Sequence, residues 1–268
     1  MTEHVNLVLG ATGTTGRRVA EILRAGGHAV RAASRSGETR FDWSDRATWE
    51  PAVAGASAVY LMAPEGVPID PGFVSLAVSR GVERVVLLSS GAIEAMRDER
   101  LLAAEHTVRG CGAAWTILRP SWFDQNFDEG FLRPAVMAGE LVLPLGEVRQ
   151  AFVDAGDIAA VAAAALTQDG HAGRSYEITG PRALSFGEAA EIIGRAIGRE
   201  VRYRGGEEDY IAANAFADEA IGAAKAFAAL RALGDQPVSG AVEEVTGRPP
   251  KSFEAYVADA AAAGAWRL

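Results

Sequence analysis

A glycine-rich turn, Gly10-Ala11-Thr12-Gly13-Thr14-Thr15-Gly16, lies between an apolar run and an amphipathic segment. The apolar run predicts a strand over 5–9, and the amphipathic segment predicts a helix over 17–24. Because glycine has no Cβ, the backbone can turn tightly and a pyrophosphate can approach the first amides of the helix. The partial positive charge at the helix N-terminus favours the same anion. In this context the turn predicts dinucleotide binding rather than a purely structural role.

Length and composition narrow the class of protein further. The chain has 268 residues, 49% of them hydrophobic, which suffices for one large α/β domain with a small lobe. A net charge of -9 without a basic stripe argues against nucleic acid as a partner, and no apolar run is long enough to span a membrane. Cys111 is the single cysteine, which excludes internal disulfides and thiolate metal clusters. We expect a cytoplasmic monomer or homodimer without a signal peptide.

The end of the second expected strand, 29–35, bears on the choice of cofactor. Proteins that prefer NAD place a carboxylate about 20 residues beyond the glycine turn, where it holds the ribose hydroxyls. This chain has Ser34 and Arg35 there instead. A guanidinium can pair with a 2′-phosphate and a hydroxyl can donate to it, which favours NADP(H). The alternative is a solvated strand end without a binding role.

A third strand is expected over 40–43, followed by a helix with Ser44 as its N-cap. Asp42 at this strand end could hold the adenine amino group, and Trp43 could form a wall beside the base. The alternative is a capping aspartate and a tryptophan that belongs to the core. The sequence does not decide between these interpretations.

Strands and helices then alternate. Strands are expected over 58–64, 84–91 and 115–120, and helices over 72–80 and 98–109. This alternation predicts right-handed crossovers and an α/β fold, a doubly wound parallel sheet of the Rossmann type. The carboxyl ends of its strands should lie beside the glycine turn, where ligands of such sheets bind.

The second half of the chain has a different pattern. Short strands are expected over 140–144, 151–154, 176–180 and 201–203. Helices are expected over 158–166, 208–233 and 253–263, and another is expected to begin after Ser185. Ser185 and Glu188 have the spacing of a capping box. We expect residues 1–150 to form mainly the cofactor domain and 151–268 to complete the sheet and form a small C-terminal substrate lobe. Four aromatic residues there could line an apolar pocket, although core packing explains each one singly: Phe216, Phe227, Phe253 and Tyr256.

Several stretches spread over the chain form a shared pattern with Ser34-Arg35 and Ser89-Ser90: GATGTTG at 10–16, TILRPSWFDQNF at 116–127, FVDAGDIAAVAAAAL at 152–166, YEITGPRALSFGEAAEIIGRAIGREV at 176–201 and VTGRPPKSFEAYV at 245–257. Together they resemble the NmrA-like branch of the atypical short-chain dehydrogenases. The similarity extends over nearly the whole chain, and its nearest group includes the ergot-alkaloid iminium reductases and the NADPH quinone reductases. The resemblance implies a Rossmann domain that binds NADPH and a smaller lobe that shapes the pocket for a small-molecule substrate.

The resemblance also implies site residues by position. Trp122, Phe123 and Asn126 match the loop beside the nicotinamide ring and the substrate. The cofactor itself is implied to contact the glycine turn and the ends of the next strands, through Gly10, Thr12, Gly13, Thr14, Thr15, Gly16, Ser34, Arg35, Asp42, Trp43, Met62, Ala63, Pro64, Ser89 and Ser90.

The chain departs from the larger family at the usual catalytic dyad. Aligning the expected helix 98–109 places Arg97 at the position of the catalytic Tyr and Leu101 at that of the Lys. Neither can act as the general acid or tune it. Asp124 and Tyr210 are candidate donors by chain proximity alone. Two functions remain: hydride transfer to an acceptor that needs little acid catalysis, such as an iminium ion or a quinone, or non-catalytic NAD(P) sensing.

Overall fold

Seven parallel strands form the central sheet of this computed structural model, which describes residues 4–214 and 220–267. The strand order is β3-β2-β1-β4-β5-β6-β8, and all neighbouring pairs are parallel. This topology confirms the predicted doubly wound Rossmann fold. The strands are β1 (Val5–Leu9), β2 (Ala29–Ser34), β3 (Thr39–Arg40), β4 (Ala56–Leu61), β5 (Arg84–Leu88), β6 (Ala114–Pro120) and β8 (Arg174–Ile178).

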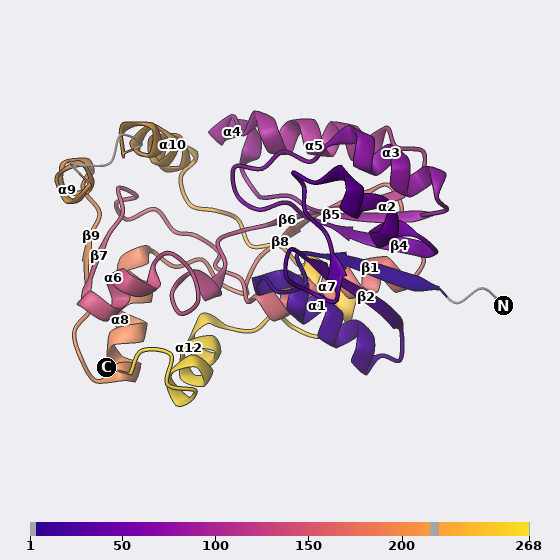
Figure 1. The fold of residues 1–268 in the computed structure, drawn as a ribbon. Coiled ribbons are helices and arrows are strands. Elements are labelled where there is room, and N and C mark those ends of the chain that lie inside the picture. The colour runs from indigo at the N-terminus through magenta and orange to yellow at the C-terminus, as the bar shows by residue number, and fades with distance from the viewer. Residues whose placement is uncertain (1–3, 215–219, 268) are drawn as a thin grey trace.

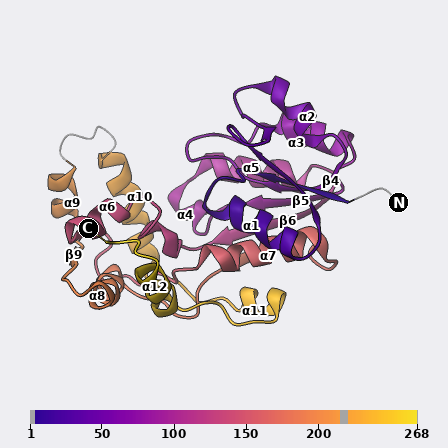
Figure 2. The same cartoon turned by 60° about the horizontal axis from the view of Figure 1, so that its bottom comes forward.

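Helices cover both faces of the sheet (Figure 1). The first face carries α2 (Trp49–Val53), α3 (Pro71–Ser79) and α5 (Glu99–Arg109). The second face carries α1 (Thr14–Ala25) and α7 (Ala155–Thr167), with the short α11 (Ala241–Thr246) packed on α7 (Figure 2). Because both faces are covered, the inner strands are apolar along most of their length.

The strand order reverses between β1 and β4, which are neighbours in the sheet. The chain first builds outward through β2 and β3, then returns to the other side of β1. At such a reversal the crossovers diverge and leave a crevice at the carboxyl ends of the strands. The glycine turn follows β1 directly and leads into α1, so it lies at this crevice.

A smaller lobe lies beyond the carboxyl ends of the strands, on the left in Figure 1. Its own core is rich in aromatic side chains, among them Phe127, Phe152, Phe186 and Phe253, whose rings pack with centroids 5.0–6.0 Å apart. Its elements are α6 (Arg133–Ala138), β7 (Glu140–Val142), α8 (Phe186–Ile197), β9 (Arg202–Arg204), α9 (Glu207–Ala213), α10 (Ala220–Leu233) and α12 (Phe253–Ala262).

The predicted strand over 40–43 is wrong, because β3 comprises Thr39–Arg40 and ends there. Local hydrogen bonds explain why the strand does not continue. The Asp42 carboxylate accepts from the Ser44 amide at 2.9 Å and from its hydroxyl at 2.7 Å, which folds the chain into a turn. Ser44 is therefore not the N-cap. That position is taken by Asp45, whose side chain accepts from the Ala47 amide.

The expected strand over 151–154 is also wrong. Only one bridge forms there, between Phe123 and Val153. Asp154 instead caps α7, because its carboxylate accepts from the Gly156 amide at 2.7 Å. By contrast, the predicted capping box of Ser185 and Glu188 at α8 is confirmed.

The expected helix over 208–233 corresponds to two helical segments. α9 ends at Ala213 and α10 begins at Ala220. Phe216, one of the four aromatic candidates for the pocket, lies outside the described residues. Phe227 on α10 is described, and its ring packs edge-on against Tyr210 with the centroids 5.5 Å apart.

Candidate cofactor and substrate site

Two glycines of the turn are required, Gly10 by its left-handed backbone and Gly16 by close packing against backbone atoms. Gly10 has φ +64°, and a Cβ on it would lie 2.3 Å from the Met62 sulfur. A Cβ on Gly16 would lie 2.2 Å from the Gly10 carbonyl oxygen. Gly13 differs, because it has an ordinary extended backbone and its Cβ would meet only that oxygen, at 3.2 Å. The open side of the turn is therefore at Gly13.

The N-terminus of α1 offers unused amides. Gly13 is its N-cap and provides no side-chain hydrogen bond. The first-turn amides, those of Thr14, Thr15 and Gly16, have no partner within the helix. The Thr15 hydroxyl is already engaged, because it accepts from the buried Tyr60 hydroxyl at 2.9 Å. Of the Thr15 donors, the backbone amide is therefore the one that can bind a ligand. Thr12 is exposed at the tip of the turn. An uncapped helix start beside an open glycine fits a pyrophosphate.

Ser34 and Arg35 lie together at the end of β2. Ser34 is 6% exposed, and its hydroxyl has no hydrogen-bond partner among the described residues. A Cβ on Gly37 would lie 2.7 Å from that hydroxyl, so the small residue there makes room for it. Arg35 is exposed. The exposed guanidinium fits the 2′-phosphate of NADP(H), whereas the unpartnered Ser34 hydroxyl is buried beside it.

We expect Arg35→Ala to weaken NADPH binding by roughly 1–3 kcal/mol, through loss of a charge-assisted contact, and to leave NADH binding nearly unchanged. Calorimetric titration of both cofactors checks this. Arg40→Ala is the matched control, since Arg40 is an exposed arginine at the end of the adjacent strand, 3.6 Å from Asp45. Equal NADPH and NADH affinities in the wild type, or equal losses in both variants, would contradict the assignment.

Asp42 and Trp43 follow β3, near the end of β4. Hydrogen bonds from Ser44 hold the pKa of the Asp42 carboxyl below its usual range. The Trp43 indole N–H donates to the Met62 carbonyl at 3.2 Å, and its ring packs edge-on against Phe73. Trp43 is thus half-buried in an aromatic cluster. Its contact with Met62 brings the two segments predicted to hold the adenosine together, Asp42-Trp43 and Met62-Ala63-Pro64.

The serines after β5 have different surroundings. Ser89 is buried, and its hydroxyl donates to the Glu105 carboxylate at 2.7 Å. Glu105 also pairs with Arg119 at 2.7 Å and with Arg109. Burial raises the pKa of Glu105, but the hydrogen bonds from Arg119 and Ser89 outweigh it and keep that pKa below its usual range. Ser89 is therefore tied to the fold, whereas Ser90 faces a cavity.

This cavity, of about 810 Å³, lies between the carboxyl edge of the sheet and the lobe. It brings Ser90 together with Trp122, Phe123 and Asn126, as the sequence predicts for neighbours of the nicotinamide. Leu230 and Leu233 of α10 line its lobe side. Several polar residues of the cavity wall are not predictable from the sequence, because they come from separate elements with no local motif: Glu94, Arg119, Gln150, Glu177 and Thr179.

Trp122 forms an aromatic wall of the cavity. Its ring packs edge-on against Phe186 at 5.2 Å and lies nearly parallel to Phe227 at 6.3 Å. Phe253 and Tyr256 do not line the cavity; they are buried in the lobe core, as the core-packing alternative holds.

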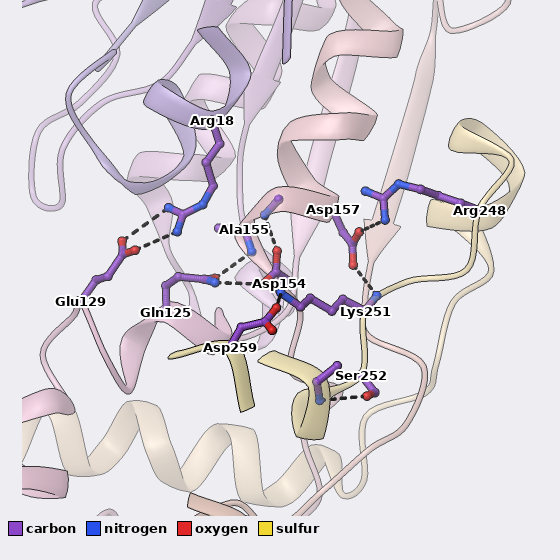
Figure 3. Close-up of polar contacts among 12 residues, drawn as sticks. Arg18, Gln125, Glu129, Asp154, Ala155, Asp157, Arg248, Lys251, Ser252 and Asp259 are labelled. Atoms are coloured by element: carbon purple, nitrogen blue, oxygen red, sulfur yellow. Dashed lines mark hydrogen bonds and ion pairs between the residues drawn. The ribbon is translucent and has the colours of Figure 1, made fainter. Parts of the chain in front are cut away.

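An ionic bridge joins α1 to the loop that carries the aromatic wall (Figure 3). Both carboxylate oxygens of Glu129 are engaged, one by Arg18 at 2.7 Å and one by Arg17 at 2.5 Å. Burial raises the pKa of Glu129, but hydrogen bonds from the two arginines outweigh it and keep that pKa low. Glu129 lies three residues beyond Asn126, so the cofactor helix and the cavity loop are directly connected.

Asp124, in the same loop, is fully buried, and neither carboxyl oxygen has a hydrogen-bond partner in the described part of the chain. Burial, with Asp154 and Asp157 nearby, raises its pKa well above the ordinary value. The neighbouring acids are bonded: Asp157 pairs with Arg248 at 2.7 Å and accepts from the Lys251 amide (Figure 3). Asp124 does not line the cavity.

Arg97 and Leu101, the residues that the sequence aligns with the usual catalytic dyad, lie in different surroundings. Arg97 precedes α5 rather than lying on it, and its left-handed backbone ends the short α4 (Ile93–Met96). Leu101 lies on α5, and its side chain is buried, with 8% exposed. Neither residue lines the cavity.

A doubly wound sheet with an uncapped glycine turn at its reversal point defines a dinucleotide-binding protein of the Rossmann class. The sequence profile of one such family, described as NAD(P)H-binding, matches residues 10–169. The chain belongs to this NAD(P)H-binding family. Within the described residues, no helix combines the length and the apolar character needed to cross a membrane.

Named relatives support the same class. Festuclavine synthase I of Penicillium roqueforti (strain FM164) is 33% identical, over 93% of this chain and 96% of its own. The uncharacterized oxidoreductase YesF of Bacillus subtilis (strain 168) is 34% identical, over 98% of this chain and 97% of its own. An NADPH-dependent quinone oxidoreductase of Escherichia coli shares the fold, with a TM-score of 0.73 at 22% identity, over 95% and 98%. The predicted family and the oxidoreductase class are confirmed.

Proposed function

We propose that this protein transfers hydride from NADPH to a small organic acceptor, an imine or iminium ion or a quinone, without a Tyr–Lys dyad. One observation carries the proposal. The cavity starts at Ser90, Trp122, Phe123 and Asn126, the residues that match nicotinamide neighbours, and continues under the lobe. NADPH, when bound, supplies the hydride, and the glycine turn with Ser34 and Arg35 holds its phosphates.

The residues of the chain supply position and apolar surface. Trp122 and Phe123 offer flat apolar surface, and Leu230 and Leu233 line the lobe side. Such orientation accounts for a large share of rate enhancement when the acceptor is already electrophilic. An iminium ion becomes a neutral amine on hydride addition, and a reduced quinone can take its proton from water. Neither reaction requires an acid at Arg97 or Leu101.

The test is an NADPH-oxidation screen against quinones, cyclic imines and activated enals, with Gly13→Val as the variant expected not to bind the cofactor. We expect saturable turnover of at least one acceptor by the wild type and none by the variant. Saturable NADPH binding without turnover of any acceptor would overturn the proposal and favour a cofactor sensor.

The absence of an acid at Arg97 gives a kinetic prediction. Arg97→Ala should change kcat/KM by no more than a few-fold, whereas removing a general acid typically costs about 10²–10⁴-fold. Trp122→Ala and Asn126→Ala should lower kcat/KM by about 10-fold or more, because they disturb positioning. Steady-state kinetics at saturating NADPH, with circular dichroism as the control for folding, decide this. A large loss confined to Arg97→Ala would show that Arg97 contacts the substrate.

A further inference from the structure

The charged residues of the cavity wall are mostly acidic. Among residues 4–214 and 220–267, the charged side chains that line the cavity are Glu94, Arg119, Glu177 and Asp235. Asp235 accepts from the backbone amide of Arg149 at 2.8 Å, a neutral donor, so it keeps its negative charge. The net charge that a ligand meets in the cavity therefore depends on how far Arg119 can compensate these carboxylates.

Most of the charge of Arg119 is used inside the protein. Its Nε donates to Oε1 of Glu105 at 2.8 Å, and its Nη2 donates to Oε2 of the same carboxylate at 2.7 Å. Glu105 is fully buried, so this two-pronged ion pair is shielded from water. Arg109 also pairs with Glu105. Even so, two guanidinium groups face three carboxylates, because Glu94 and Glu177 share Arg119 as well.

Glu177 is the least compensated of the carboxylates around Arg119. The Glu94 carboxylate lies 2.7 Å from Nη2 of Arg119, whereas the Glu177 carboxylate lies 3.6 Å from Nη1. Partial burial raises the pKa of the Glu177 carboxyl above its usual range, and Arg119 offsets this only in part. The Glu177 side chain is 56% exposed, so a ligand in the cavity can reach its carboxylate.

The Glu177 carboxylate lies beside the position expected for the nicotinamide. Glu177 is near the carboxyl end of β8, and a Cβ on Gly91 would lie 3.6 Å from its Oε2. Gly91 directly follows Ser90, which matches a nicotinamide neighbour. Trp122 lines the same cavity and adds aromatic surface, which attracts cations through the ring quadrupole. An acceptor placed for hydride transfer would therefore contact a carboxylate that lacks a full counter-charge.

We propose that Glu177, supported by Glu94, is a specificity-determining residue that selects a positively charged acceptor. This proposal rests on the proposed reductase function and favours, among its acceptors, the iminium ion. When hydride from NADPH adds to the iminium carbon, a C–H bond forms and the π pair of the C=N bond becomes a lone pair on nitrogen. The acceptor leaves as a neutral amine. Reduction of a neutral quinone instead develops a negative charge beside two carboxylates, which costs free energy.

The experiment compares Glu177→Gln with Glu191→Gln. Glutamine keeps the shape of glutamate and removes its charge. Glu191 lies on α8, does not line the cavity and pairs with Arg195 at 3.9 Å. Each variant thus removes one negative charge and one long, exposed ion pair, but only one of them changes the cavity wall.

The first readout is binding of the N-methyl-3,4-dihydroisoquinolinium ion and of 1,4-naphthoquinone, measured by calorimetry at low and at high salt. The protein is saturated with tetrahydro-NADP, an analogue whose nicotinamide ring is uncharged and cannot donate hydride. The second readout is the ratio of kcat/KM for the iminium ion to that for the quinone, with NADPH. Circular dichroism checks that each variant folds.

We expect Glu177→Gln to weaken iminium binding and to lower the kcat/KM ratio, each by about 5- to 20-fold. Quinone binding should stay near that of the wild type in every variant. Glu94→Gln should act in the same direction with a smaller effect, and Glu191→Gln should leave the ratio unchanged. In the wild type, high salt should weaken iminium binding and spare quinone binding.

Three results would overturn the role of Glu177: no iminium binding by the wild type, an equal loss of iminium binding in Glu191→Gln, or an equal loss of quinone binding in Glu177→Gln. If Glu177→Gln does not fold, Glu94→Gln and the wild-type salt dependence decide, and iminium binding that ignores both would contradict the proposal. Failure of the reductase function has a separate signature, in which the wild type binds the iminium ion selectively but turns over neither acceptor.

Discussion

Gly13→Val will abolish NADPH binding, with a loss of roughly 100-fold or more, in a chain that still folds. Gly13 has φ -86° and ψ 177°, which valine adopts readily, and its Cβ would meet only the Gly10 carbonyl oxygen, at 3.2 Å. A shift of a few tenths of an ångström relieves that contact. The branched side chain would then occupy the open side of the turn, where the pyrophosphate must approach the amides.

Gly16→Val is the matched comparison, because its Cβ would lie 2.2 Å from the same backbone oxygen. We expect this variant to lose stability as well as binding. Thermal unfolding separates the two effects, and calorimetric titration with NADPH measures the first. Normal NADPH affinity in a folded Gly13→Val protein would place the cofactor elsewhere.

Asp124→Asn will stabilise the protein near neutral pH and remove part of its pH dependence. The Asp124 pKa is raised well above its ordinary value of 3.8, chiefly by burial. Above 3.8 the unfolded chain releases this proton while the folded protein retains it. The folded state then binds more protons, so the free energy of unfolding falls as pH rises, by at most about 1.4 kcal/mol per pH unit for this one group. Asparagine has nearly the same shape and does not titrate.

The measurement is urea unfolding of both proteins at several pH values from about 4 to 7. The wild-type free energy of unfolding should fall relative to that of Asp124→Asn as pH rises. Asp169→Asn is the control, since the Asp169 side chain is 99% exposed. Asp128 and Asp157, whose pKa values burial also raises, are present in both proteins, so the difference reports Asp124 together with its electrostatic coupling to these neighbours. Parallel curves for wild type and variant would contradict the explanation.

The sequence predicts the parts of this fold that depend on neighbouring residues. The glycine turn, the capping box at Ser185 and the alternation of strands and helices all follow from local physics, and the parallel sheet follows from them. Where two local solutions compete, the sequence alone chooses wrongly: Ser44 and Asp45 are both good caps, and the turn made by the Asp42 carboxylate decides between them.

The cavity wall was predictable only in part. Trp122, Phe123 and Asn126 lie in one stretch, so their resemblance to known proteins placed them together. Gln150 and Glu177 come from a bridge and an edge strand that meet only after the chain has folded. The charge balance of this wall depends on contacts between separate elements, which no spacing along the sequence reveals.

The bridge from Arg17 and Arg18 to Glu129 has a consequence for how the two ligands meet. It fastens the loop that ends the aromatic wall to the helix whose first amides would hold the pyrophosphate. The conformational entropy of that loop is therefore lost during folding rather than when the acceptor arrives. The proposed acceptor half of the site is therefore preformed relative to the proposed cofactor half. The two ligands would enter a site whose parts are already placed with respect to each other.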